Sequence, residues 1–244
     1  MLRQGLQMGA LLLAFMLGVA AERGGLLAAL EQHWEDIRFL AAQHLRLSLG
    51  AGSLAVASGI PLGVLLSRLM PGRSASIGLQ LVNVGAAIPA LALLALVAGL
   101  IGVGTLPAIV VLWLAALLPI VRNTYTGLRA LPEPLRDIAL GLGMRPWQLL
   151  WRVELPVALP GVLAGIRTAL TVSIGVASLV ALIGGGGLGE LIFTGIALND
   201  TNLMLSGGIP AACLALGLDA LMAGLSIWLV PRGIRLENRS AERP

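Results

Sequence analysis

The 244-residue sequence contains no lysine, a single cysteine and few charged or aromatic side chains. The absence of lysine excludes a P-loop nucleotide site and a Schiff-base site, because both need that amine. The single cysteine, Cys213, excludes a disulfide framework and a multi-cysteine metal site within the chain. Its apolar neighbours predict a small buried side chain. We therefore expect no metal or cofactor in this chain and any nucleotide hydrolysis on a separate one.

Hydrophobic residues make up 57% of the chain and charged residues only 11%, with a mean hydropathy of +0.93. A soluble domain does not have this composition. Apolar runs of about 20 residues cross a bilayer as helices, because backbone polar groups cannot stay unpaired in lipid. The predicted fold class is therefore all-α, a polytopic membrane protein with about six transmembrane helices. The six runs are residues 5–21, 47–66, 78–101, 105–121, 161–183 and 206–230.

The arginines are concentrated on one side of these spans. With the N-terminus in the cytoplasm, the inner segments hold twelve of the 16 arginines, whereas the outer stretch 184–205 holds none. Basic segments stay in the cytoplasm, so both termini are predicted to be cytoplasmic. The chain then divides into an N-terminal membrane helix with an outer interfacial segment (1–46), a transmembrane core (47–230) and a basic cytoplasmic tail (231–244). The core includes a cytoplasmic loop at about 130–158.

Two interpretations of the first span stay open. It is either a retained signal-anchor helix, which we favour, or a signal peptide that is cleaved before Glu22. Residues 22–46 have apolar side chains at partly helical spacing and are predicted to lie at the membrane interface. His33 and His44 have no second ligand at metal spacing, so both are expected on that outer surface.

A polar, arginine-bearing stretch lies between the fourth and fifth spans. Pro132 suits the first turn of a helix, Gly143 supplies the left-handed residue that commonly ends one, and Pro146 can begin a second. Pro156 and Pro160 are expected to prevent this second helix from running straight into the next span. The pattern predicts two short helices at an angle, a rigid surface element that can transmit force between domains.

The order of residues in this hairpin resembles the "EAA" loop of binding-protein-dependent ABC importer permeases. That loop reads Glu-Ala-Ala, three residues, Gly, nine residues, Ile, any residue, Leu-Pro. The sequence keeps the spacing, with Asp137 in place of Glu, Ile138 in place of the first Ala and Val153 in place of Ile. In that family the loop is the coupling helix that docks in a groove on the cytoplasmic ATPase. The resemblance implies a type I ABC importer permease fold and an ATPase-coupling role for Asp137, Ala139, Gly143, Met144, Leu155 and Pro156.

Further segments narrow the resemblance, which covers about residues 44–222. They look like the permeases of glycine betaine, choline, carnitine and proline importers, although amino-acid and methionine permeases share parts of them. The segments are Ile88-Pro89, Gly102 with Gly104, Leu118–Thr124 with Gly127, and Ile183–Gly189. The resemblance implies a non-catalytic permease subunit of an ATP-driven importer in the bacterial inner membrane, with quaternary-amine osmoprotectants as substrates. The alternative within the family is a permease for an amino acid such as methionine or proline.

Several residues in or near the spans are candidates for the translocation pathway or its gate. Prolines kink membrane helices, and glycines give flexible or closely packed backbone at the outer mouth. Close helix packing explains the same glycines equally well. Gly184, Gly186 and Gly189 also match a dinucleotide fingerprint, but that motif needs a preceding strand, which an all-α chain lacks. The pathway candidates are Asn83, Pro89, Pro119, Asn123, Gly186 and Gly187.

Two charged residues lie inside predicted spans. Asp219 is well inside the last span, where an ionisable residue indicates a function. Arg167 can either pair with it or extend to the cytoplasmic surface. A structural ion pair or hydrogen bond is favoured over a proton relay, because a relay needs more than one carboxylate.

Quaternary ammonium ligands are usually held in cages of aromatic rings. The chain has nine aromatic residues and none are clustered, so the selective site is expected on a separate extracytoplasmic binding protein. The other expected partners are a cytoplasmic ABC ATPase dimer carrying ATP and Mg²⁺, a second permease chain, identical or paralogous, and the lipid bilayer, with no nucleic acid. A secondary transporter is the alternative outside the family, but it needs more intramembrane charges or an inverted repeat.

Overall fold

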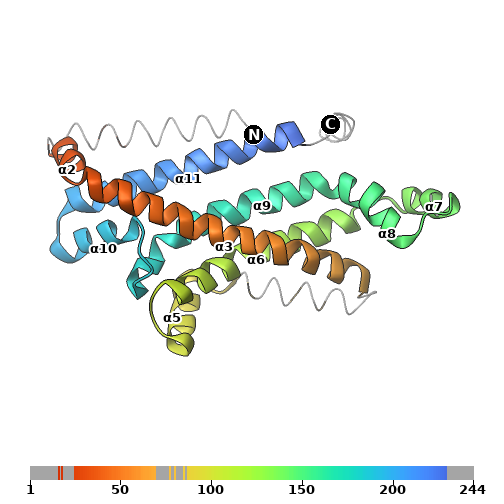
Figure 1. Cartoon of the computed structure of the whole chain (residues 1–244), viewed down its shortest axis with the longest axis horizontal. Coiled ribbons are helices and arrows are strands. Elements are labelled where there is room, and N and C mark those ends of the chain that lie inside the picture. The colour runs from red at the N-terminus through yellow and green to blue at the C-terminus, as the bar shows by residue number, and fades with distance from the viewer. Residues whose placement is uncertain are drawn as a thin grey trace. The chain divides into compact units, whose positions relative to one another are not determined.

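The computed structural model describes residues 25–69 and 87–229, together with residues 16, 18, 77, 80 and 85. Helices joined by short turns make up this part of the chain, and it contains no strand (Figure 1). The all-α prediction is confirmed. In chain order the elements are α2 (Leu26–Gln32), α3 (Trp34–Leu69), α5 (Ala90–Ile101), α6 (Thr105–Arg129), α7 (Glu133–Gly141), α8 (Pro146–Leu149), the π-helical turn η1 (Leu150–Glu154), α9 (Leu155–Ala177), the 3-10 turn η2 (Leu179–Ile183), α10 (Gly189–Leu198) and α11 (Thr201–Leu229).

Four described helical segments are long and apolar enough to cross a membrane. They contain the second and fourth predicted spans, most of the fifth and nearly all of the last. The segments are Trp34–Arg68, Thr105–Arg129, Pro146–Ala177 and Thr201–Leu229. Helix α5 covers the end of the third predicted span, whereas the first predicted span lies almost entirely outside the described residues.

The described residues form two compact units. Unit 1 holds residues 25–50, 90–112 and 174–218, and an apolar cluster in it joins α3, α10 and α11 through Ile37, Leu40, Leu188, Leu191, Leu203 and Ala211. Unit 2 holds residues 51–69, 113–173 and 219–229 with the described residues of 77–89, and its cluster joins α3, α6 and α9 through Ala55, Ala116, Leu117, Ile120, Val121 and Ala169. In unit 2 the alanines of this cluster let the helices approach closely.

Helix α3 differs from its prediction because it begins at Trp34. Residues 34–46 therefore belong to the same continuous helix as the second predicted span, and their place at the membrane interface stays a prediction. The charges of Glu35, Asp36 and Arg38 lower the local hydropathy, but they occupy only the exposed face of the helix. The opposite face buries Ile37 and Leu40 in the cluster of unit 1.

Two predictions about single side chains were wrong. His44, expected on the outer surface, is fully buried, and its Nε2–H donates to the Ile174 carbonyl at 3.1 Å. Cys213, expected to be buried, is exposed on α11. Only 6% of the most apolar 18-residue stretch of α11 is buried within the chain. Most side chains of this helix are therefore expected to contact lipid or another chain.

Candidate functional site

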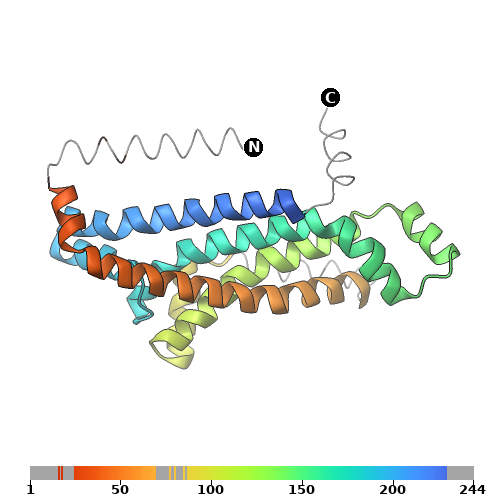
Figure 2. The same ribbon diagram turned by 45° about the horizontal axis from the view of Figure 1, so that its top comes forward.

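The hairpin, residues 132–156, projects beyond the ends of α6 and α9 in unit 2 (Figures 1 and 2). Its first helix, α7, ends in a Schellman motif. Gly143 lies in the left-handed region at φ +79, and its N–H donates to the Leu140 carbonyl at 2.9 Å. The Met144 N–H donates to the Ala139 carbonyl at 3.1 Å. The predicted helix end at Gly143 is confirmed, and the direction of the chain after α7 depends on this residue.

The second helix of the hairpin begins at Pro146, as predicted. The Gln148 side chain caps it by accepting a hydrogen bond of 2.8 Å from the Arg145 N–H. Helix α8, the turn η1 and helix α9 follow one another without a break. They do not run straight, because the chain bends between α8 and α9 (Figure 2), as the prolines predict. The π-helical turn η1 lies directly before the prolines, and such a turn changes the hydrogen-bond register of a helix. Pro156, which has no backbone N–H to donate, lies two residues after the end of this turn, where the change of register accommodates the missing donor.

The hairpin carries several large hydrophobic side chains that are mostly exposed. Leu142 is 75% exposed, Trp151 66% and Ile138 61%, and Trp147 is also exposed. A soluble surface rarely carries such a group of apolar side chains without a partner. The hairpin therefore has the character of a docking surface.

A buried carboxylate anchors the hairpin to α3. Glu154 is only 4% exposed, and Arg68, near the end of α3, donates Nη2–H to its Oε2. Arg136 of α7 donates Nε–H to Oε1 at 3.1 Å, and the Nη1 of Arg68 also donates to the Pro146 carbonyl at 3.1 Å. The Glu154 carboxylate thus connects α3 and α7 to η1, and Arg68 also connects α3 to the start of α8. This role was not predicted, because Glu154 occupies the unspecified position of the EAA pattern.

The other coupling candidates lie in the same hairpin. Asp137 is exposed and makes no ion pair within the described part of the chain. Ala139 is buried, and Met144 is half-buried. Leu155 and Pro156 are the first two residues of α9. The structure thus places these residues around one element, and their roles in coupling stay predictions.

Three of the pathway candidates, Pro89, Pro119 and Asn123, lie in unit 2, and a fourth lies outside the described residues. Asn83 is not among the described residues, and Pro89 is exposed directly before α5. Pro119 lies inside α6, and the Asn123 side chain donates to its carbonyl at 2.8 Å. A Cβ on Gly165 of α9 would lie 2.7 Å from the Cβ of Asn123 and 3.1 Å from the Pro119 carbonyl. Pro119 and Asn123 therefore lie at a close contact between α6 and α9.

The glycine loop, residues 184–187, lies in unit 1 after η2. Gly186 and Gly187 have φ values of +83 and +86, and the Gly187 N–H donates to the Gln43 side chain at 3.0 Å. A Cβ on Gly187 would lie 3.1 Å from Nδ1 of His44, and one on Gly186 would overlap the Gln43 amide. The loop follows the 3-10 turn η2, whereas a dinucleotide-binding glycine motif follows a strand.

We expect Gly186→Ala to destabilise unit 1. The left-handed conformation costs an alanine about 1–2 kcal/mol, before any overlap with Gln43 is counted. The midpoint of thermal unfolding should fall by at least about 2–4 °C. Gly175→Ala is the control, because Gly175 lies in α9 and a Cβ added there would have no atom within 4 Å. An equal midpoint for both variants would contradict the packing assigned to the loop.

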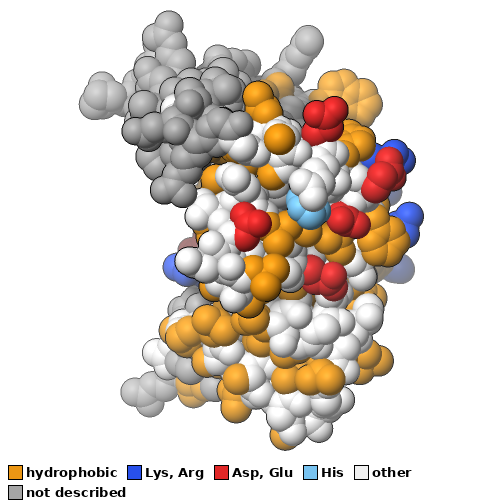
Figure 3. Space-filling view, turned by 90° about the vertical axis from the view of Figure 1, so that its left-hand side faces the viewer, with side chains coloured by type: hydrophobic (Ala, Val, Ile, Leu, Met, Phe, Trp, Pro, Cys, Tyr) orange, Lys and Arg blue, Asp and Glu red, His pale blue; other side chains and the backbone are white. Residues whose placement is uncertain are grey.

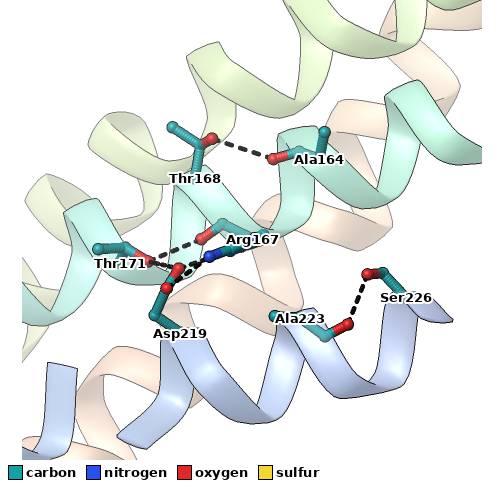
Figure 4. Close-up of polar contacts among 7 residues, drawn as sticks. All are labelled: Ala164, Arg167, Thr168, Thr171, Asp219, Ala223 and Ser226. Atoms are coloured by element: carbon teal, nitrogen blue, oxygen red, sulfur yellow. Dashed lines mark hydrogen bonds and ion pairs between the residues drawn. The ribbon is translucent and has the colours of Figure 1, made fainter. Parts of the chain in front are cut away.

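Arg167 and Asp219 form the ion pair that the sequence left open (Figure 4). Nε and Nη2 of Arg167 each lie 2.6 Å from a different oxygen of Asp219. The Thr171 hydroxyl donates to the Arg167 carbonyl at 3.0 Å and lies 3.5 Å from Oδ1 of Asp219. The pair joins α9 to the last part of α11 within unit 2.

This fold is the type I ABC importer permease fold. A chain of the MetNI methionine ABC transporter in an inward-facing conformation superposes with a TM-score of 0.71 at 24% identity, over 80% of this chain and 96% of that one. Residues 59–234 match the family described as "Binding-protein-dependent transport system inner membrane component". The chain belongs to this family, and it is a multi-pass membrane protein.

Two curated relatives match over most of their length. The osmoprotectant import permease protein OsmY of Salmonella typhimurium is 44% identical over 92% of both chains. The glycine betaine/carnitine/choline transport system permease protein OpuCB of Bacillus subtilis is 39% identical over 84% of this chain and 94% of that protein.

Proposed function

We propose that this chain is the permease subunit of an ATP-driven importer for quaternary-amine osmoprotectants such as glycine betaine, carnitine or choline. Relatives named for osmoprotectant and for glycine betaine, carnitine and choline transport support this proposal, because they match nearly the whole chain at about 40% identity. Methionine or proline transport, the alternative within the family, has less support. The MetNI chain resembles this one at only 24% identity.

The hairpin is the element on which a cytoplasmic ATPase would dock. The observation that carries this step is the combination of a fixed backbone and exposed apolar side chains. The Schellman motif at Gly143 and the anchor at Glu154 fix the hairpin, while Leu142 and Trp151 extend from it. ATP and Mg²⁺ would be bound by the ATPase, which moves the hairpin and with it α3, α7 and α8. This chain then performs no hydrolysis itself.

Unit 1 is expected to receive substrate from an extracytoplasmic binding protein. Figure 3 shows acidic side chains spread among hydrophobic ones on one face of the molecule. The exposed acidic residues of unit 1 are Glu31, Glu35, Asp36, Glu190 and Asp200, against the two exposed arginines Arg38 and Arg46. Because the positive-inside rule depends on basic residues, the small number of arginines in the described part of unit 1 makes this the expected outer side. With unit 1 outside, we infer that both termini are cytoplasmic.

Each chain contains one coupling hairpin, and an ABC ATPase dimer would engage two. A complete transporter would therefore contain two permease chains, either identical or paralogous. The poor cover of α11 within a single chain is consistent with a second chain beside it.

Uptake by the reconstituted transporter tests the proposal. Proteoliposomes would contain this chain with its ATPase and the loaded binding protein on the side opposite the ATPase. We expect ATP-dependent accumulation of radiolabelled glycine betaine, carnitine or choline, and none with a non-hydrolysable ATP analogue. Methionine and proline serve as matched controls. Uptake that persists without ATP would indicate a secondary carrier, and uptake of methionine alone would overturn the substrate class.

A further inference from the structure

The Arg167–Asp219 pair is partly exposed although two hydrogen bonds join its side chains. The Arg167 side chain is 43% exposed and that of Asp219 is 34% exposed, whereas Glu154 in the hairpin is almost completely covered. Both residues lie within segments that are long and apolar enough to cross the membrane. A charged residue in the middle of a bilayer costs about 2.5–3.5 kcal/mol on insertion scales. This face of unit 2 is therefore expected to adjoin water or protein rather than lipid.

The open side of the pair is a pocket of about 350 Å³. Small-molecule sites begin at about 300 Å³, so the pocket has room for a compact solute. Four of its six lining residues are polar, and none is aromatic. They are Ala164, Arg167, Thr168, Thr171, Val172 and Asp219. Figure 4 shows Thr171, Arg167 and Asp219 directed toward one another between α9 and α11.

The charges in this pocket are arranged as a dipole. Arg167 uses Nε and Nη2 for Asp219, and its Nη1 has no hydrogen-bond partner among the described residues. A guanidinium can bind a second carboxylate through such free N–H groups. A zwitterion that lies antiparallel to the pair would place its carboxylate at Arg167 and its ammonium group beside Asp219. The ion pair need not break for this to happen.

We propose that this pocket is a transit site for zwitterionic quaternary amines, with Arg167 binding the carboxylate of the solute and Asp219 facing its trimethylammonium group. The inference rests on the proposed function and adds a substrate-binding step to it. The absence of aromatic side chains makes the site weak for a bare ammonium group, because no ring face is available. The site therefore favours betaines and carnitine over choline, which has no carboxylate. Weak binding also suits release into the cytoplasm.

The first test compares maximal uptake rates at a saturating concentration of solute-loaded binding protein. Under these conditions the affinity of the solute for the binding protein does not affect the measured rate. A hydrogen bond to a charged group contributes about 1.5–3 kcal/mol, so Arg167→Gln should lower the glycine betaine rate by about tenfold or more. The choline rate should change much less. Asp219→Asn breaks the same pair from its other side and should slow both solutes, because both carry the ammonium group.

The second test asks whether water and solute reach the pocket. Cys213→Ala removes the only cysteine, and Thr168→Cys then places a single thiol at an exposed pocket position. We expect a charged, membrane-impermeant methanethiosulfonate reagent to modify this thiol during ATP turnover. Glycine betaine carried by the binding protein should slow the modification. If the wild-type transporter carries glycine betaine but not choline, the rates of the first test cannot be compared, and this second test decides whether the pocket is a transit site.

Equal losses for glycine betaine and choline in Arg167→Gln, or a thiol at position 168 that glycine betaine does not protect, would overturn the transit site and leave a structural ion pair. A wild-type transporter that takes up neither solute would instead contradict the proposed function.

Discussion

Gly143→Val is expected to uncouple ATP hydrolysis from uptake while the protein still inserts into the membrane. Gly143 has a φ of +79, and a β-branched residue fits that conformation poorly. The left-handed conformation costs about 1–2 kcal/mol for an ordinary residue, which alone lowers the equilibrium constant for forming the native hairpin by about tenfold. Both Schellman hydrogen bonds, from Gly143 to Leu140 and from Met144 to Ala139, would be lost with it. The measurement is the number of solute molecules transported per ATP hydrolysed.

Two variants make this prediction specific to the backbone. Gly141→Ala changes a glycine two residues earlier that lies in α7, has no positive φ and has no atom within 4 Å of the added methyl group. It should leave coupling unchanged. Gly143→Asn should retain most of the coupling, because asparagine tolerates the left-handed conformation. If asparagine impairs coupling as strongly as valine does, the conformation of Gly143 is not the cause.

The hairpin could be predicted because its form depends on local sequence. Pro132, Gly143 and Pro146 act on their own backbone, and the structure places the helix boundaries beside them. The continuous segment through Pro156 could not be predicted in this way, because a π-helical turn compensates for the proline and leaves no clear mark in the sequence.

The residues that were missed or misplaced have distant partners. Glu154 binds Arg136, 18 positions away, and Arg68, 86 positions away, and neither spacing is a local pattern. His44 is buried, and its hydrogen-bond partner Ile174 lies 130 positions away. The Arg167–Asp219 pair could be predicted although its residues are 52 positions apart. Charged residues within apolar spans are few, and they usually pair with one another.

The arginines around Glu154 are expected to be more important for stability than the carboxylate itself. Arg68 is 29% exposed and Arg136 41%, so either can reach water if Glu154 is replaced. Glu154 is 4% exposed and cannot. Combining Arg68→Met with Arg136→Met would leave this carboxylate buried without a partner, at a cost of about 3–5 kcal/mol. Glu154→Gln alone should cost much less.

Adding Glu154→Gln to the double arginine variant should therefore restore stability, because it removes the buried charge. The measurement is the thermal unfolding midpoint of the four proteins in the same detergent, combined as a mutant cycle. Uptake should fall in every variant that releases the hairpin from α3, since the ATPase would then move the hairpin without moving that helix. A triple variant no more stable than the double one would show that the unpaired carboxylate is not what destabilises the protein. Normal uptake in the double variant would show that the link between Arg68 and the hairpin does not transmit the movement.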